Sequence, residues 1–393
     1  GITTQLDLEA GSFPVGFYGE HFKSGAQLHY GSSVAHFAVR PKVIEGIDQT
    51  YVFVGHKPSK MGGDTWTQKA TTAQIASMRE LLEQGLDEGG LGIGVLLDYM
   101  TSAVSKEELQ MIFEVAAKRH VPAYVHVRRG SNGDPAGLIE VLELAKLTGA
   151  PLFICHITHN AMGNVGDWLA MIDQANADGA NITTETLSYT AGGTAISADV
   201  FKRRDWQTIF DISYEDVQWV ATGEWLNEET WNTYSKEQPY GMVNHHYVKE
   251  DWIITAMKWP KMMVSTDALP ALDRDVLTNP NIAGTFSRVL GHYVRDTKLL
   301  SLRDGLAKTS LLQAQWMEQF FPAFKKKGRL QESADADIVI FNPDTVAANA
   351  DYGTPFKQPT GIHHVIVGGR HIVDNATRIE GRYPGKKILN FGP

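Results

Sequence analysis

The chain has 393 residues, of which 43% are apolar, and a formal net charge of −9. This composition is typical of a folded globular protein, and the acidic balance argues against a nucleic-acid partner, which would need clustered Lys and Arg. The length exceeds one ordinary domain but fits a barrel with a small appendage, and no apolar stretch approaches the roughly 20 residues of a membrane helix.

Seven short apolar runs predict buried parallel strands, because they are rich in β-branched residues and mostly lack polar alternation. In chain order they are 2–8, 27–36, 91–97, 122–127, 151–157, 181–189 and 261–266. Helical patterns separate several of them. Ser105 begins one helix as an N-cap, and two more are expected over 135–147 and 165–175.

This alternation of strands and helices predicts an α/β fold with a parallel sheet. We expect a (β/α)8 TIM-type barrel, because polar residues of interest fall at the C-terminal ends of strands, where barrel active sites lie. An eight-stranded barrel needs one strand more than the seven runs, and we expect the missing first strand upstream of Gly1. No Gly-x-Gly-x-x-Gly fingerprint supports a dinucleotide fold instead.

The pattern changes near residue 326, where short strands joined by Gly, Pro and Asn turns begin. Helices from Phe286 to about Phe320 are expected to close the barrel before that point. We therefore predict a barrel domain over residues 1–325, incomplete at its N-terminus, and a small β domain over residues 326–393.

Four possible metal ligands stand at the ends of predicted strands: Glu9, His126, His156 and Asp267. Imidazole nitrogen and carboxylate oxygen suit Zn²⁺, in one or two ions, or another divalent metal. Each residue also has a structural interpretation, because a strand-end His is often simply hydrogen-bonded and an Asp after a strand often caps a helix or forms a turn. Their coincidence at four strand ends favours a metal centre.

Further residues are candidates for substrate binding. Arg128 and Arg129 follow His126 closely, and either would hold a substrate carboxylate by a bidentate pair, although a surface salt bridge is an equal alternative. Tyr189 ends a predicted strand and would donate a hydrogen bond to an oxyanion. The single cysteine, Cys155, lies in an apolar run, so a buried structural thiol is expected rather than a nucleophile.

Motifs along nearly the whole chain share the order and spacing of one known family. They occupy residues 1–4, 90–94, 126–128, 190–194, 265–270, 284–290 and 334–339, together with His156. This set resembles the D-aminoacylase (N-acyl-D-amino-acid deacylase) branch of the amidohydrolase superfamily.

The resemblance implies that His126 and His156 bind metal, and that Asp267 binds metal and acts as a general base. Many relatives have a metal-binding Cys at the position of Ala10, and we interpret the adjacent Glu9 as its substitute. The family's first strand carries a His-x-His metal pair, which occurs nowhere in these 393 residues. We therefore expect the ligand set of this chain to be incomplete.

The implied activity is hydrolysis of a linear amide in a small-molecule substrate, an N-acyl (D-)amino acid, by a metal-activated water. A cyclic amidase of the dihydroorotase or hydantoinase type is an alternative that would share the barrel and the ligands. A non-catalytic amidohydrolase-like barrel is another, and the absent His-x-His pair favours it. The oligomeric state is not indicated by the sequence.

Overall fold

A curled parallel sheet forms the centre of the computed structural model, which describes residues 1–20, 22, 24–49, 53–54, 57–58, 63–202, 205–268 and 278–391. Its order is β1-β2-β5-β6-β7-β8-β12. The strands are β1 (Thr4–Ser12), β2 (His29–Ala35), β5 (Ile93–Leu96), β6 (Ala123–His126), β7 (Leu152–Ile154), β8 (Ile182–Thr186) and β12 (Met263–Val264). Six of them lie within the predicted runs, and β1 extends past its run to Ser12, so the strand predictions are confirmed.

The sheet is most of a barrel with an open seam. Every adjacent pair in it is parallel. β1 and β12 form its two edges, and among the described strands they do not pair with each other. Seven strands of a TIM-type barrel, together with a small antiparallel appendage, confirm the predicted fold class.

Helix α4 (Lys106–Arg119) shows how the sequence places the outer layer. The Ser105 hydroxyl accepts a hydrogen bond from the backbone N–H of Glu108 at 3.3 Å, as a helix N-cap does. Leu109, Ile112 and Phe113 then recur at helical spacing and are fully buried. The predicted N-cap and helix are therefore confirmed.

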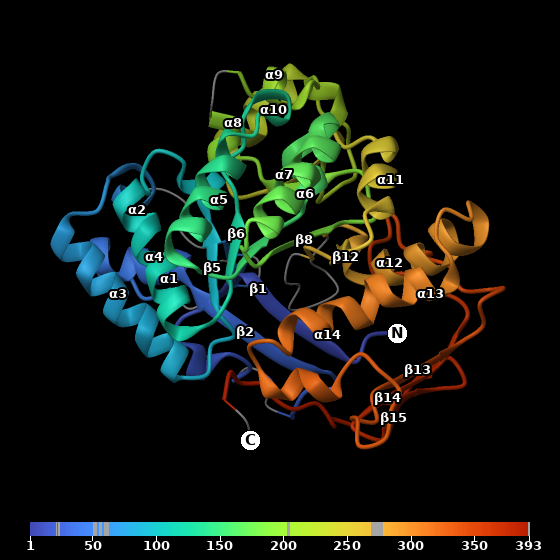
Figure 1. Ribbon diagram of the computed structural model, residues 1–393. Coiled ribbons are helices and arrows are strands. Elements are labelled where there is room, and N and C mark those ends of the chain that lie inside the picture. Colours follow the sequence, from blue (N-terminus) through green and yellow to red (C-terminus); the bar gives the residue numbers. More distant parts are fainter. Residues whose placement is uncertain are drawn as a thin grey trace.

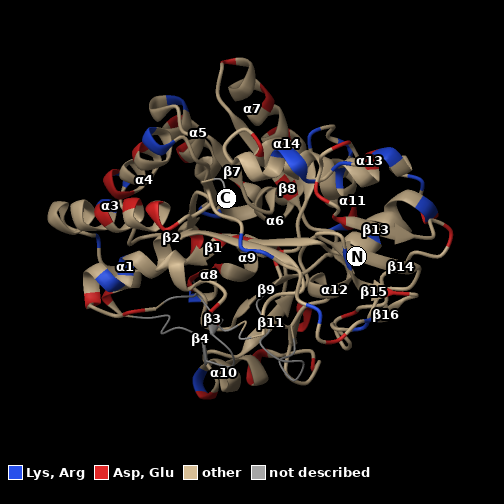
Figure 2. Cartoon of the chain, turned by 90° about the horizontal axis from the view of Figure 1, so that it is seen from below, with Lys and Arg blue, Asp and Glu red and all other residues tan. Residues whose placement is uncertain are grey.

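Several helices lie outside the curled sheet (Figure 1). They include α1 (His36–Glu45), α3 (Thr72–Asp87), α4, α5 (Ala136–Thr148) and α7 (Val165–Ala177). Charged residues gather on these helices, whereas the strands inside are mostly uncharged (Figure 2). No helix in the described ranges is long and apolar enough to cross a membrane.

An antiparallel sheet between β8 and β12 was not predicted from the sequence. It consists of β9 (Gly192–Ala195), β10 (Val217–Trp219) and β11 (Met242–His245) in the order β10-β11-β9. Helices α8 (Asp199–Lys202), α9 (Trp206–Phe210) and α10 (Glu228–Glu237) accompany it. Stacking of Trp206 on Trp231, with ring centroids 4.7 Å apart, helps to form a separate apolar cluster.

The chain then passes through α11 (Glu250–Lys258) and β12 to α12 (Asn281–Arg288), a π-helical segment (Val289–Asp296), α13 (Leu302–Leu306) and α14 (Leu312–Met317). The appendage is a four-stranded antiparallel sheet of β13 (Ile338–Phe341), β14 (Ile362–Val367), β15 (Arg370–Asp374) and β16 (Thr377–Arg378). Beyond it the chain returns to the barrel, where the Ile388 amide donates to the Tyr30 carbonyl at 2.7 Å.

Candidate metal centre

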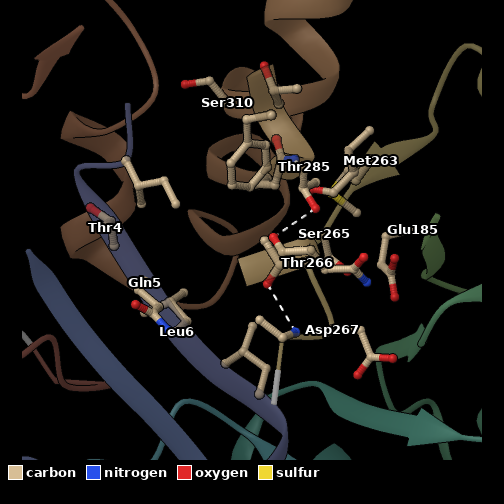
Figure 3. A pocket seen from close by; sticks show the side chains of 18 of the residues that line it. Thr4, Gln5, Leu6, Glu185, Met263, Ser265, Thr266, Asp267, Thr285 and Ser310 are labelled. Atoms are coloured by element: carbon tan, nitrogen blue, oxygen red, sulfur yellow. Dashed lines mark hydrogen bonds between the residues drawn. The ribbon is translucent and has the colours of Figure 1, made fainter. Parts of the chain in front are cut away.

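A cavity of about 1900 Å³ extends along the inside of the curled sheet. β1 forms one wall, and residues at and after the ends of β8 and β12 form another. Figure 3 shows Leu6 of β1 across this space from Glu185 of β8 and from Asp267, which follows β12. The C-terminal ends of several parallel strands therefore face one enclosed volume, as in barrel enzymes.

Three possible ligand atoms meet on the wall of this cavity. Oε1 of Glu9 lies 2.9 Å from Nδ1 of His126 and 3.2 Å from Nε2 of His156. The two ring nitrogens are 3.1 Å apart. Zinc holds nitrogen and oxygen ligands at about 2.0–2.1 Å in a tetrahedron, which separates the ligand atoms by roughly 3.3 Å. The spacing of these three atoms therefore fits a common cation.

The backbone at two strand ends is unusual. His156, which precedes helix α6 (Ile157–Ala161), has a φ of 34°, and Asp267 has a φ of 43°. Left-handed backbone is uncommon outside glycine and persists where surrounding contacts impose it, often at functional sites. At His156 the imposing contact is with Glu185, whose carboxylate accepts a hydrogen bond from the His156 backbone N–H.

Asn160 sets the direction of the His156 ring. Its amide nitrogen donates to the Cys155 carbonyl at 3.0 Å and to Nδ1 of His156 at 3.1 Å, while its oxygen accepts from Arg129 at 3.1 Å. With Nδ1 as an acceptor, the ring hydrogen of neutral His156 lies on Nε2, which faces Glu9. A cation bound through Nε2 would displace that hydrogen, as metal binding to imidazole requires.

The second ring nitrogen of His126, Nε2, faces the carboxylate of Asp98. Within the described part of the chain, Nε2 of His126 is buried without a hydrogen-bond partner, and Oδ2 of Asp98 lies 3.8 Å away. The other oxygen of Asp98 accepts a hydrogen bond from the backbone N–H of Arg129 at 2.9 Å. A carboxylate behind a histidine ligand is a common means of orienting a metal-binding ring.

The carboxyl groups at this site differ in their proton affinity. Burial raises the pKa of Glu9, but His156 and His126 outweigh it and hold that pKa well below its usual value. Burial, followed by the neighbouring charge of Glu9, raises the pKa of Asp267 to about 6. Burial also raises the pKa of Glu185 to about 7. Asp267 and Glu185, whose pKa values are raised, can therefore take up and release protons near neutral pH, whereas Glu9 stays ionised.

The structure brings Glu9, His126 and His156 together, with Asp267 lining the same cavity outside that group of three. Cys155 is buried, as expected, and burial raises the pKa of its thiol well above the usual value. Of the motif at 265–270, residues 269 and 270 lie outside the described residues.

Among the residues predicted to bind substrate, Arg128 and Tyr189 are not part of the described lining of the cavity. The Arg128 guanidinium donates to Glu140 at 2.9 Å and to the carbonyls of Thr101 and Val104. The Tyr189 hydroxyl donates to the Ala350 carbonyl at 3.2 Å.

Arg129 and Tyr99 line the cavity instead. The Arg129 guanidinium lies 5.0 Å from the ring centroid of Phe210 and 5.7 Å from that of Tyr247. Strand alternation would place Arg128 on the same side as His126, but β6 ends at His126, so alternation does not extend to Arg128. No sequence signal distinguished the two arginines.

The unpredicted antiparallel sheet also contributes to the cavity. His245 at the end of β11 and Tyr247 beyond it line the cavity, and their rings stack with centroids 5.0 Å apart. The Tyr247 hydroxyl donates to the backbone carbonyl of His159 at 2.9 Å. These contacts tie the inserted sheet to the segment that follows the His156 strand.

No protein-family model matches the chain. Among curated proteins, it is 28% identical over 331 residues to the N-acyl-D-glutamate deacylase of Alcaligenes xylosoxydans xylosoxydans, and 29% identical over 331 residues to the D-aminoacylase of the same organism. Each match covers 80% of this chain and 65% of the relative. The chain therefore spans slightly less than two thirds of the length of these relatives.

Solved structures agree on the fold. A crystal structure of D-aminoacylase, described as defining a subset of amidohydrolases, has a TM-score of 0.76 and 21% identity, covering 95% of this chain and 75% of its own. The N-acyl-D-glutamate deacylase of Bordetella bronchiseptica, complexed with zinc and a phosphonate inhibitor, has a TM-score of 0.75, 24% identity and the same two coverages. A dihydropyrimidinase of Brevibacillus agri is less similar, with a TM-score of 0.57 and 18% identity over 100% of this chain and 81% of its own. In sequence and in fold, the chain is thus similar to the D-aminoacylases and N-acyl-D-glutamate deacylases.

Proposed function

We propose that this chain belongs to a metal-dependent hydrolase that cleaves the linear amide bond of a small N-acyl amino acid. The observation that carries the proposal is the convergence of Glu9, His126 and His156 in a cavity that Asp267 also lines. The curated relatives support the substrate class, because they are deacylases of N-acyl-D-amino acids.

Glu9, His126 and His156 would hold a zinc ion or a similar divalent metal. Catalytic zinc sites typically use three protein ligands and keep one position open, whereas structural sites use four. When bound, such an ion acidifies water and polarises a carbonyl group. These three donors agree in number and type with a catalytic centre, even without the His-x-His pair that the family resemblance implies.

Asp267 is the proposed proton carrier. Its carboxyl group lies outside the three-ligand group, lines the cavity and has a pKa raised to about 6 by burial. It would take a proton from the attacking water and pass it to the leaving nitrogen of the amide. A general base with a pKa near the working pH is suited to both transfers.

Arg129 is the proposed anchor for the carboxylate of the substrate. Its guanidinium is buried beside Phe210 and Tyr247 and lines the cavity. An arginine in such a place can bind a carboxylate by two parallel hydrogen bonds. Arg128 is less suitable for this role, because it is not part of the described lining of the cavity, and its guanidinium donates to Glu140 and two carbonyls.

Hydrolysis assays on the full chain supplied with Zn²⁺ would test this function. The substrates are N-acetyl-D-glutamate and N-acetyl-D-leucine, their L isomers, and two cyclic amides, hydantoin and dihydrouracil. We expect turnover of the linear D compounds, and a loss of about 100-fold or more in Asp267→Asn, since general acid–base catalysis contributes at least that much. Asp178→Asn, which alters an exposed carboxylate after α7, is the matched control.

Two outcomes would overturn the proposal. Turnover restricted to the cyclic amides would identify a hydantoinase-type enzyme. Zinc-loaded chain without activity on any substrate of the panel would favour a non-catalytic barrel.

A further inference from the structure

A second group of histidine and carboxylate side chains lies on the appendage. Nδ1 of His364 in β14 is 2.9 Å from Oδ1 of Asp374 in β15, and Nδ1 of His371 is 3.7 Å from the same oxygen. The ligand atoms of these three residues all lie within 4.8 Å of one another. We propose that His364, His371 and Asp374 form a second binding site for a divalent transition metal, separate from the cavity.

A β-bulge places the three side chains on one face. Val365 pairs with Val373, so His364 lies opposite Asp374, but the register then shifts and His371 lies opposite Ile366. In a regular strand, residues three apart point to opposite faces. The bulge between these pairs brings His371 to the face of Asp374, and re-aiming a side chain is a known effect of bulges.

A tight turn fixes the position of Asp374. Asp374 pairs with Thr377 in β16, and the two residues between them, Asn375 and Ala376, have φ values of 47° and 61°. Positive φ at both central residues is the geometry of a two-residue hairpin turn. Because β14 and β16 hold β15 on both sides, the backbone of this site is ordered before any ligand binds, which lowers the entropic cost of binding.

Hydrogen bonding within the group leaves one nitrogen unsatisfied. His364 reaches Asp374 at hydrogen-bond distance, but the 3.7 Å separation from His371 is too long for a hydrogen bond. Nδ1 of His371 is shielded from water and has no hydrogen-bond partner among the residues that the structure describes. Separations of 2.9 and 3.7 Å lie on either side of the roughly 3.3 Å expected for ligand atoms around zinc. A shared cation would therefore satisfy all three groups at once.

The donor set indicates the kind of metal. Two imidazoles and one carboxylate suit Zn²⁺, Ni²⁺ or Cu²⁺, with Cu²⁺ bound most tightly, whereas Mg²⁺ and Ca²⁺ prefer oxygen ligands. The side chains of His364, His371 and Asp374 are 25%, 40% and 48% exposed, so water has access to complete the coordination.

The site lies behind one wall of the cavity. Val365, Ile372 and Val373 of the same two strands line the cavity, whereas His364, His371 and Asp374 do not. A metal bound there would join β14 to β15 across the outer face of that wall.

Metal counting on the full chain tests this site. The chain is dialysed against Zn²⁺, and bound zinc is counted for the wild type, His371→Ala, Asp374→Asn and His363→Ala. His363 is the matched control, because it is an exposed neighbour of His364 outside the group. We expect His371→Ala and Asp374→Asn each to lose one zinc per chain and His363→Ala to lose none. Asp374→Asn retains the size of the side chain, so its loss would not reflect unfolding of the hairpin.

A Cu²⁺ titration followed by electron paramagnetic resonance gives a second readout. We expect nitrogen coupling from two imidazoles, lost in His371→Ala. Wild-type zinc counts in both His371→Ala and Asp374→Asn, or an equal loss in His363→Ala, would overturn the proposal. Either result would leave the centre at Glu9 unaffected, because His126→Ala tests that centre separately.

Discussion

Two buried groups of histidine and carboxylate side chains differ in how completely their polar atoms are paired. At the junction of barrel and appendage, His29 donates from Nε2 to Asp337 at 3.1 Å and accepts at Nδ1 from the Lys386 amide at 3.1 Å. Asp337 also accepts from Lys327 at 2.6 Å and from the Gly368 amide at 2.8 Å. Both ring nitrogens and both carboxylate oxygens therefore have partners, as buried polar groups in a structural role normally do.

The group in the cavity contains the same residue types but lacks this completeness. Glu9, His126 and His156 bring three ligand atoms within 3.2 Å of one another, and none of the described residues forms a hydrogen bond with Nε2 of His126. An incompletely paired buried group needs an explanation, and a bound ion is one of the usual ones. The comparison teaches that the completeness of pairing, rather than burial or residue type, separates a structural histidine from a candidate ligand.

The largest expected effect comes from removing a ligand. His126→Ala should lose bound zinc and lower kcat/KM by more than about 100-fold, because even the partners of metal ligands often contribute 10- to 100-fold. Metal analysis and kinetics measure both effects. The matched control is His29→Ala, which removes an equally buried histidine from the junction and should retain the zinc content. Equal zinc content in His126→Ala and the wild type would show that incomplete pairing of polar atoms does not mark the cavity group as a metal site.

A substitution at the junction of barrel and appendage should lower the free energy of unfolding and leave the zinc content unchanged. Asp337→Asn removes the more buried of the two carboxylates that pair with Lys327 and leaves Asp335, at 2.8 Å, as its partner. Because Lys327 keeps one partner, the expected cost is that of lost hydrogen bonds to a charged group, about 1.5–3 kcal/mol. Urea unfolding should show a decrease of roughly this size in the free energy of unfolding, with zinc content unchanged. A change of less than about 1 kcal/mol would mean that the pairing at the junction contributes little.

The sequence identified the strands better than the cavity contacts. Buried parallel strands produce continuous apolar runs that can be read without tertiary information, and β5 to β8 followed that rule. β9, β10 and β11 are as short as β5 to β7, but Gly, Gln and Asn interrupt them, so they form no continuous apolar run in the sequence. His245 and Tyr247 were therefore missed as cavity residues.

The direction of side chains beyond the end of a strand could not be predicted from the sequence. Glu9, His126 and His156 were identifiable because each ends or closely follows an apolar run. The roles of Arg128 and Arg129 depend on the direction of the chain after β6 ends, and that direction is set by tertiary contacts such as the hydrogen bond from the Arg129 amide to Asp98.

A smaller effect is expected behind the metal centre. Asp98→Asn should weaken zinc binding by about tenfold, because it removes the charge of the carboxylate nearest to Nε2 of His126. Competition with a zinc chelator measures this change. Asp178→Asn serves again as the control with the same change of charge. An unchanged zinc affinity would show that Asp98 orients Arg129 and does not support the metal centre.

The smallest effect is a pH dependence at the junction. Burial raises the pKa of Asp337, but hydrogen bonds from His29, Lys327 and the Gly368 amide outweigh burial and hold that pKa well below its usual value. In the unfolded chain an aspartate titrates near pH 3.9, so its charged form contributes full stability above about pH 5. As the pH falls below about 4, the unfolded chain takes up the proton first, and the contribution is lost. The difference in unfolding free energy between the wild type and Asp337→Asn should therefore be constant from pH 5 to 7 and shrink toward pH 3. Urea unfolding at these pH values measures it, and a difference that stays constant down to pH 3 would mean that the charge of Asp337 does not carry the stability of the junction.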